Sequence, residues 1–364
     1  MRRPDYKLVA VFFAIALGWV SLVALALFVA GASKLSFGAA LAAQLTVGFV
    51  YMPAPLVAAL IVERMAGRGY LVKTTFRGFL GKLARLALTS TAVVLGVYGL
   101  MVVGVFLLGN ALHVPGVGTF VLTPEGLAAN IGALLGPAAQ HSMAGSGKAP
   151  APAMLLAIGG PAGLAAGLSV NGVFAFGEEY GWRGWLMDEL EPIGPVRANL
   201  LTGVLWGLWH APLILMGFNF EPYRIAGVFF MCGLTTSLSF LLWRARQFTG
   251  SLLAPAVIHG AFNGFQGFLV LLIVARNPLV SAPAGVLGWT AIGLVAATLW
   301  AVSSGHLRAE PPAAAGSLPE GGTIPAAWRV LRRPPAPTTR SSSWRFRSVS
   351  SACPTWASPR CSRH

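Results

Sequence analysis

Eight long hydrophobic stretches run through this 364-residue chain, and each is long enough to cross a lipid bilayer. A transmembrane helix needs about 20 consecutive apolar residues, because every backbone polar group must be satisfied inside the segment. The stretches cover residues 8–30, 38–62, 86–109, 152–178, 198–218, 224–243, 251–275 and 283–302. They predict an all-α fold, a polytopic transmembrane helical bundle of about eight spans.

The composition supports a membrane protein over a soluble one. Hydrophobic residues make up 55% of the chain and charged residues 10%, whereas a soluble domain carries about 25% charged residues. The net charge of +15 would suit a nucleic acid if it covered one surface. Instead, nine Arg against two Glu fall within residues 305–364, and the other charges lie mostly in short loops. We therefore expect membrane lipid as a partner and no nucleic acid.

Loop charges predict the orientation of the bundle. The 63–85 connection carries six Lys and Arg residues, while the longer 110–150 connection carries only Lys148. The positive-inside rule therefore places the first of these connections in the cytoplasm. With an even number of spans, both termini are then expected to be cytoplasmic, in an integral protein of a bacterial-type inner or plasma membrane.

Three regions are predicted along the chain. Residues 1–150 hold N-terminal transmembrane helices and loops, with an uncleaved first helix and, in the last loop, room for a short helix near 124–138. Residues 151–303 form the core that carries the chemistry. Residues 304–364 are rich in Pro, Ser and Arg without periodicity, which predicts a disordered tail.

Small residues indicate how some helices pack. Gly159, Gly163 and Gly167 are spaced four residues apart in one stretch, and so are Gly203 and Gly207 in the next. Such spacing lets two helix backbones approach closely in a membrane. We interpret these glycines as packing positions without chemical meaning.

Charged side chains inside membrane spans are rare and often functional, since each costs about 2.5–3.5 kcal/mol on insertion scales. The segment FGEEYGWRG places Glu178 next to Glu179, with Arg183 one helical turn beyond Glu179. In a continuous helix Glu179 and Arg183 share a face and can pair. Glu178 is rotated by about 100° from Glu179 and is free for another role.

Two further segments carry intramembrane polar residues. The stretch WGLWHAPLILM has Trp206 and His210 one turn apart, with His210 well inside the apolar run. The stretch PAVIHGAFNG has His259 and Asn263 one turn apart, so both project in one direction. A single His inside a membrane span more often forms a hydrogen bond between helices than acts as a catalyst.

Together, these residues favour chemistry over packing. A Glu and two His can activate water as general bases, or hold one metal ion at a site with an open position. Asn263 adds a neutral donor that can stabilise an oxyanion. We therefore expect Glu178, His210, His259 and Asn263 to meet in one pocket.

The three segments resemble the CPBP family of intramembrane proteases, the CAAX-protease and bacteriocin-processing group also called Abi. Its pattern is EExxxR, then FxxxH, then HxxxN, and the matching part of this chain is about residues 150–275. Trp206 stands where the family usually has Phe, a change that we expect to affect packing rather than chemistry. Glu179 and Arg183 would hold the helix end in place.

The resemblance implies a cavity that opens toward the cytosol. In it, Glu178 and His210 would activate water, while His259 and Asn263 stabilise the oxyanion. Two mechanisms stay open: one with a divalent metal such as zinc, held by Glu178, His210 and His259, and one with no metal. The soluble-metalloprotease signature HExxH is absent from the sequence.

The function predicted in this way is that of a CAAX-type intramembrane endopeptidase, of the metallo- or glutamate-type. Its substrate would be a membrane-associated peptide, either prenylated or carrying a leader. One alternative is a non-catalytic scaffold or immunity-type protein of the same fold. Another is a proton-coupled transporter, although the sequence has no inverted repeat or paired broken helices of the kind transporters use.

Overall fold

The computed structural model describes residues 3–31, 45–67, 71, 76, 78–136, 140–141 and 150–309. Helices make up almost all of the regular structure in these ranges, so the predicted all-α membrane bundle is confirmed. The α-helices are α1 (Tyr6–Val29), α3 (Ala54–Met65), α5 (Phe79–Val105), α6 (Pro124–Leu135), α8 (Pro152–Gly167), α9 (Val170–Glu179), α10 (Met187–Leu190), α11 (Pro195–Trp209), α12 (Ala211–Leu215), α13 (Arg224–Thr249), α14 (Leu253–Leu272) and α15 (Val286–Ala309).

Shorter elements complete the described part of the chain. Wider π-helical turns form η2 (Val47–Tyr51), η3 (Phe106–Ala111) and η4 (Tyr180–Leu186), and η5 (Glu191–Ile193) is a 3₁₀ turn. The strands β1 (Thr119–Phe120) and β2 (Ile273–Val274) form one antiparallel pair. Helix α15 continues to Ala309 and so includes the first six residues of the range predicted as a tail, 304–364. The rest of that prediction, and the division into three regions, lies outside what these residues test.

Six helical segments of the described chain are long and apolar enough to cross a membrane. They are Tyr6–Val29, Val47–Met65, Phe79–Ala111, Arg224–Thr249, Leu253–Leu272 and Val286–Ser303. A seventh is possible if Pro152–Gly167 and Val170–Ile193, which meet at a 60° bend, count as one span. Large apolar side chains such as Leu22 and Leu88 point outward, as expected for an integral membrane protein in contact with lipid.

About eight spans were predicted, and the described residues hold six such segments, or seven if the bent pair counts as one span. The 198–218 stretch does not form one long helix, because α11 ends at Trp209 and α12 is a separate five-residue helix. Pro212 lies at the start of α12 and has no N–H to continue the hydrogen bonds of α11. His210 consequently lies at the junction between two helices rather than inside one.

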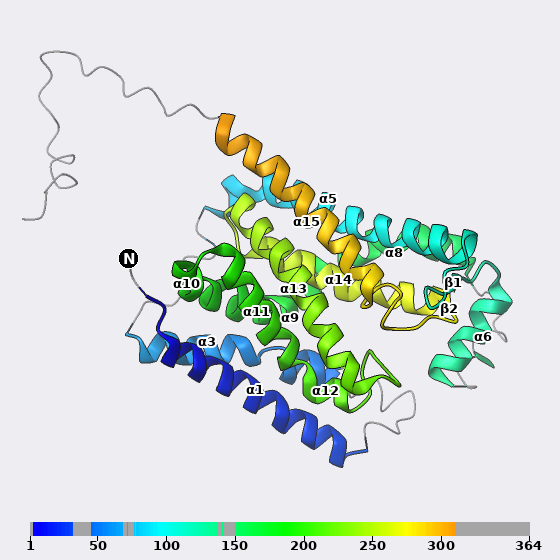
Figure 1. Cartoon of the computed structure of the whole chain (residues 1–364), viewed down its shortest axis with the longest axis horizontal. Helices are drawn as coiled ribbons and strands as arrows, with labels where there is room; N and C mark the ends of the chain where they lie inside the picture. Colours follow the sequence, from blue (N-terminus) through cyan, green and yellow to red (C-terminus); the bar gives the residue numbers. More distant parts are fainter. Residues whose placement is uncertain are drawn as a thin grey trace, which may run out of the picture. The chain divides into compact units, whose positions relative to one another are not determined.

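Helices α13 and α14 connect the parts of the bundle (Figure 1). α13 packs against α11, α14 and α15, while α14 packs against α5, α8 and α9. α1 packs along α3, and α5 contacts α8, α14 and α15. Two of the three motif-bearing segments, α9 and α14, are thus in direct contact, although 80 residues separate Glu179 from His259.

The predicted glycine packing is confirmed. A Cβ atom on Gly163 would lie 2.8 Å from the Cβ of Phe265, so α8 and α14 meet closely there. Likewise, a Cβ atom on Gly203 would lie 2.5 Å from the Cα of Thr236, and one on Gly207 would lie 2.5 Å from the Cα of Cys232. Helices α11 and α13 therefore approach so closely that only glycine fits at these points.

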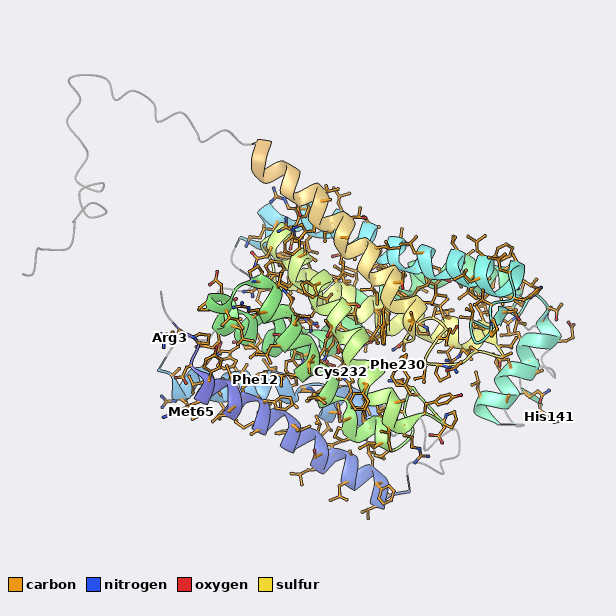
Figure 2. The ribbon with its side chains drawn as sticks, viewed as in Figure 1. Arg3, Phe12, Met65, His141, Phe230 and Cys232 are labelled. Atoms are coloured by element: carbon orange, nitrogen blue, oxygen red, sulfur yellow. The ribbon has the colours of Figure 1, made fainter. Side chains whose placement is uncertain are left out.

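The first helix is joined to the segment after α9 by aromatic packing. Phe12 of α1, labelled in Figure 2, is fully buried. Its ring lies 5.3 Å from that of Trp182 in an edge-to-face arrangement and 5.1 Å from that of Trp185 in a stacked one. Aromatic pairs of these geometries are favourable beyond their buried area. Phe12 thus packs α1 against two side chains of η4.

We expect Gly203→Ala to destabilise the bundle by about 1–3 kcal/mol, because the added methyl group must push α11 away from the backbone of α13. Thermal unfolding in detergent would show a lower midpoint. Gly293→Ala is the matched control, since a Cβ there meets nothing within 4 Å. Equal midpoints for the two variants would contradict the close packing of α11 on α13.

Candidate active site

The site begins at the bend between α8 and α9. Ser169 lies between the two helices, and its hydroxyl donates to the carbonyl of Ala165 over 2.8 Å. Such a bond from Ser to a carbonyl one turn earlier bends helices. After the bend, α9 runs to Glu178 and Glu179 and continues directly into the π-helical η4. Short π-helical turns are frequent at functional sites.

Glu179 is the buried centre of a charged cluster. Its Oε1 accepts a hydrogen bond from Arg183 over 3.1 Å, which confirms the predicted pairing of these two residues. The same oxygen lies 2.8 Å from Nδ1 of His259. Because an ionised carboxylate can only accept, Nδ1 of His259 carries the proton in this contact. Glu179 therefore joins α9 and η4 to α14, a link that the sequence analysis did not anticipate.

Glu178 points in a different direction, as the helical rotation predicted. Its Oε2 accepts a hydrogen bond of 2.8 Å from the indole N–H of Trp206, and its side chain lines a cavity. The carboxyl group is almost fully buried.

His210 is held by the same residue of α11. Its Nδ1 lies 2.8 Å from the backbone carbonyl oxygen of Trp206. A carbonyl oxygen only accepts, so Nδ1 donates and the neutral ring keeps its lone pair on Nε2. His210 is thus set in the tautomer that a base acting through Nε2 requires.

Trp206 makes more contacts with this cluster than a residue that only fills space would make. Its ring lies 3.9 Å from the guanidinium carbon of Arg183 and 5.2 Å from the ring of His259. Its indole N–H binds Glu178, which a phenylalanine in this place could not do. The hydrogen bond is a contact beyond packing, while the expectation that Trp in place of Phe affects packing rather than chemistry stays a prediction.

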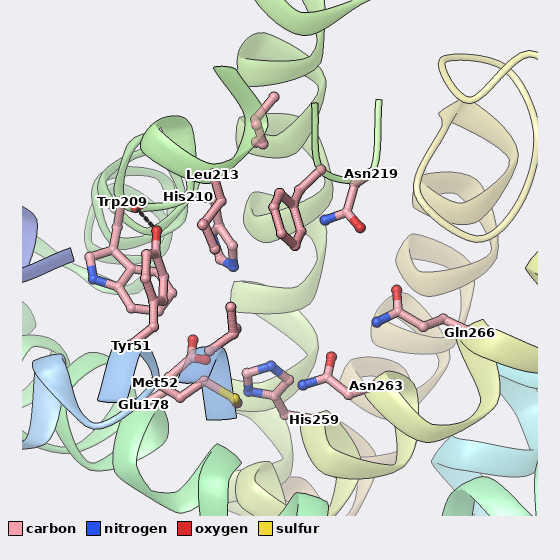
Figure 3. Close-up of a pocket in the computed structure, with 13 residues that line it drawn as sticks. Tyr51, Met52, Glu178, Trp209, His210, Leu213, Asn219, His259, Asn263 and Gln266 are labelled. Atoms are coloured by element: carbon pink, nitrogen blue, oxygen red, sulfur yellow. Dashed lines mark hydrogen bonds between the residues drawn. The ribbon is translucent and has the colours of Figure 1, made fainter. Parts of the chain in front are cut away.

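Side chains from η2, α9, α11, α12, α14 and the loop after α12 surround one cavity of about 230 Å³ (Figure 3). All four residues predicted to carry the chemistry, Glu178, His210, His259 and Asn263, line it. Figure 3 shows His210 facing Glu178 and His259 across the open space. The predicted convergence of these residues is present in the fold, while their chemical roles stay predictions.

Three more polar residues line the cavity and were missed in the sequence. Gln266 lies three residues after Asn263 and seven after His259, so its helical spacing could have revealed it. Asn219 follows α12 with a left-handed backbone (φ 67°), and Tyr51 comes from η2 and donates to the carbonyl of Trp209 over 2.7 Å. Nothing in the sequence pattern marks the last two, since only the fold brings them to this cavity.

Hydrogen bonds from Arg246 of α13 hold the end of η4 and the start of α10. Arg246 donates to both carboxylate oxygens of Asp188, over 2.7 and 3.0 Å, and to the backbone carbonyl of Arg183. A bidentate contact of this kind fixes geometry as well as adding energy. The π-helical turn and the residue that follows it closely, Asp188, are thus bonded to α13.

The donor set does not fit a metal ion as the residues stand. Within the described ranges, no three side chains among His, Cys, Asp and Glu are grouped so that they could hold one ion. This includes the set of Glu178, His210 and His259 considered above. Nδ1 of each His is bonded to a carbonyl or carboxylate oxygen, which leaves Nε2 as the ring atom directed elsewhere. We therefore derive no chemical step that passes through a metal.

The comparisons with known proteins agree with the motifs. Residues 160–265 match the family described as Type II CAAX prenyl endopeptidase Rce1-like. The chain is also 31% identical over 101 residues to CAAX prenyl protease 2 of Methanococcus maripaludis. That alignment covers 26% of this chain and 37% of the relative's length. The resemblance to the CPBP family is thereby confirmed for the segment that carries the three motifs.

We expect Glu179→Gln to destabilise the protein by about 3–5 kcal/mol, because it leaves the fully buried guanidinium of Arg183 without its counter-charge. Unfolding in detergent, followed by tryptophan fluorescence, would measure the loss. Glu221→Gln is the control. Glu221 also pairs with an Arg close in sequence, Arg224, but both of these side chains are about half exposed. No measurable loss is expected there, and a similar loss in both variants would contradict the importance of burial.

Proposed function

Because residues 160–265 match the Rce1-like family, we propose that this chain is an intramembrane endopeptidase of the CAAX-protease type. The observation that carries the proposal is the convergence of Glu178, His210, His259 and Asn263 on one cavity. In an apolar bundle, a cavity with two imidazoles, a carboxyl and an amide has the groups needed for hydrolysis of an amide bond.

In the proposed reaction, Glu178 and His210 act on a water molecule in the cavity. The water gives a proton to the Glu178 carboxylate while its oxygen attacks the carbonyl carbon of the scissile peptide bond. His210 accepts a hydrogen bond from the water at Nε2, because its Nδ1–H already donates to the backbone carbonyl of Trp206. The proton then passes from Glu178 to the leaving amine as the C–N bond breaks.

His259 and Asn263 are proposed to stabilise the tetrahedral oxyanion. They are one helical turn apart on α14 and line the same cavity. With Nδ1 of His259 bonded to Glu179, a protonated ring still has Nε2–H to donate into the cavity. The Asn263 amide supplies a second, neutral donor. Removing one such donor typically slows hydrolysis about 100- to 1,000-fold.

We propose a membrane-associated peptide as substrate, either prenylated or carrying a leader, reached from the cytosolic side. The relative's name refers to a prenyl protease, and the basic 63–85 connection supports a cytosolic location for the end of the bundle that carries it. The amides of Asn219 and Gln266 at the same cavity can hydrogen-bond a peptide backbone in an extended conformation.

We expect Glu178→Gln and His210→Ala each to slow cleavage about 100- to 10,000-fold, as for loss of a general base. The measurement is cleavage of prenylated and unprenylated peptides by purified protein in proteoliposomes. Glu125→Gln is the control, because Glu125 is exposed in the first turn of α6, away from the cavity. Full cleavage by both site variants would refute the proposed reaction. A non-catalytic scaffold predicts instead that the wild type cleaves nothing and both variants keep the cellular phenotype.

Cleavage is expected to survive treatment with a metal chelator, since the residues at the cavity are not grouped as a metal site. Elemental analysis of the purified protein should give less than one metal ion per chain. Both measurements use the same peptide as above. Loss of cleavage on chelation, with recovery on adding zinc, would show that Glu178, His210 and His259 come together differently in the working enzyme.

A further inference from the structure

Trp206 binds both of the groups assigned above to water activation. Its indole Nε1–H donates to Oε2 of Glu178 over 2.8 Å. Its backbone carbonyl accepts from Nδ1 of His210, also over 2.8 Å. The side chain is 1% exposed, so neither contact competes with water at the surface. The carboxyl and the imidazole are therefore oriented by opposite ends of a single residue.

We propose that Trp206 is a positioning residue, whose indole N–H holds the Glu178 carboxylate in the orientation that accepts a proton from water. This inference rests on the proposed function. A glutamate side chain has several rotatable bonds, and fixing one carboxylate oxygen restricts the direction of the other. A donor that is itself fixed by packing can do this before substrate arrives, which is the basis of preorganised catalysis.

The hydrogen bond from the indole of Trp206 is not needed to satisfy a buried N–H group in this protein. Among the residues that the structure describes, the ring nitrogens of Trp182, Trp185 and Trp209 are buried without a hydrogen-bond partner. This protein therefore tolerates unpaired indole N–H groups at three places close to the site. The N–H of Trp206 differs from them because it faces an acceptor that the reaction needs.

The ring of Trp206 has a separate role that phenylalanine can share. Its face contacts the Arg183 guanidinium at 3.9 Å, and its edge-to-face contact with His259 has ring centroids 5.2 Å apart. An aromatic ring of either kind can make these contacts. The bond from the Trp206 carbonyl to His210 does not depend on the side chain at all. Trp206→Phe therefore removes the contact to Glu178 and keeps the others.

The test is the steady-state cleavage of a peptide by Trp206→Phe. We expect kcat to fall about 10- to 100-fold, the effect of one hydrogen bond to a charged group. KM should stay within about twofold, since the indole contacts Glu178 and not the substrate. Trp185→Phe is the matched control: it deletes the same atoms from a buried indole whose N–H has no partner. It should keep the kcat of the wild type.

Glu178→Gln, assayed in parallel, separates this inference from the function on which it rests. If Glu178→Gln keeps full activity, the proposed function itself falls. If Glu178→Gln is inactive while Trp206→Phe has the wild-type kcat, only the positioning role falls. An equal fall of kcat in Trp185→Phe would also overturn it.

Trp206→Phe could fail to fold, which size-exclusion chromatography in detergent would reveal. A second variant tests the same inference in that case. Benzothienylalanine, incorporated at position 206 alone, keeps the shape of the two fused rings but has sulfur in place of the N–H group. The same loss of kcat is expected, again with little change in KM. A wild-type kcat for this variant would contradict the role of the indole N–H.

Discussion

The arrangement of the site depends on one buried carboxylate, that of Glu179. Its side chain is fully buried and accepts from both Arg183 and His259. An ion without partners would be several kcal/mol less stable in such surroundings, so the chain must bring cations or donors to it. Arg183 comes from the next helical turn, whereas His259 comes from another helix. This requirement fixes α14 against α9 in one rotation and aims Asn263 and Gln266 into the cavity.

Close helix packing makes this possible in an apolar bundle. Water does not drive helices together inside a membrane, so contact distance and buried polar bonds decide which helices associate. The glycines of α8 admit α14, and those of α11 admit α13. α11 must lie close to α9 for Trp206 to reach Glu178, and α14 must lie close to α9 for His259 to reach Glu179. The small residues and the polar bonds therefore depend on one another.

The sequence allowed prediction of what helical periodicity determines. The pair of Glu179 and Arg183, the different direction of Glu178, and the shared face of His259 and Asn263 all follow from 3.6 residues per turn. The sequence predicted that the polar residues meet in one pocket. It did not predict which atoms pair between helices, such as the bond from Glu179 to His259, or that Tyr51 and Asn219 line the cavity. The stretch around His210 was taken as one span because hydropathy does not register that Pro212 ends the hydrogen bonding of α11.

The two groups proposed to activate water, Glu178 and His210, are placed by one residue. Glu178 lies in α9, and His210 lies at the junction after α11. Packing alone would let the distance between the two side chains vary as the helices shift. Both side chains are hydrogen-bonded to Trp206, so the covalent geometry of this one residue limits how far their distance can vary. The residue is itself held by Arg183 and His259, which are fixed by Glu179. The buried charge and the cavity are thus parts of one connected network, and a shift of α11 would disturb both at once.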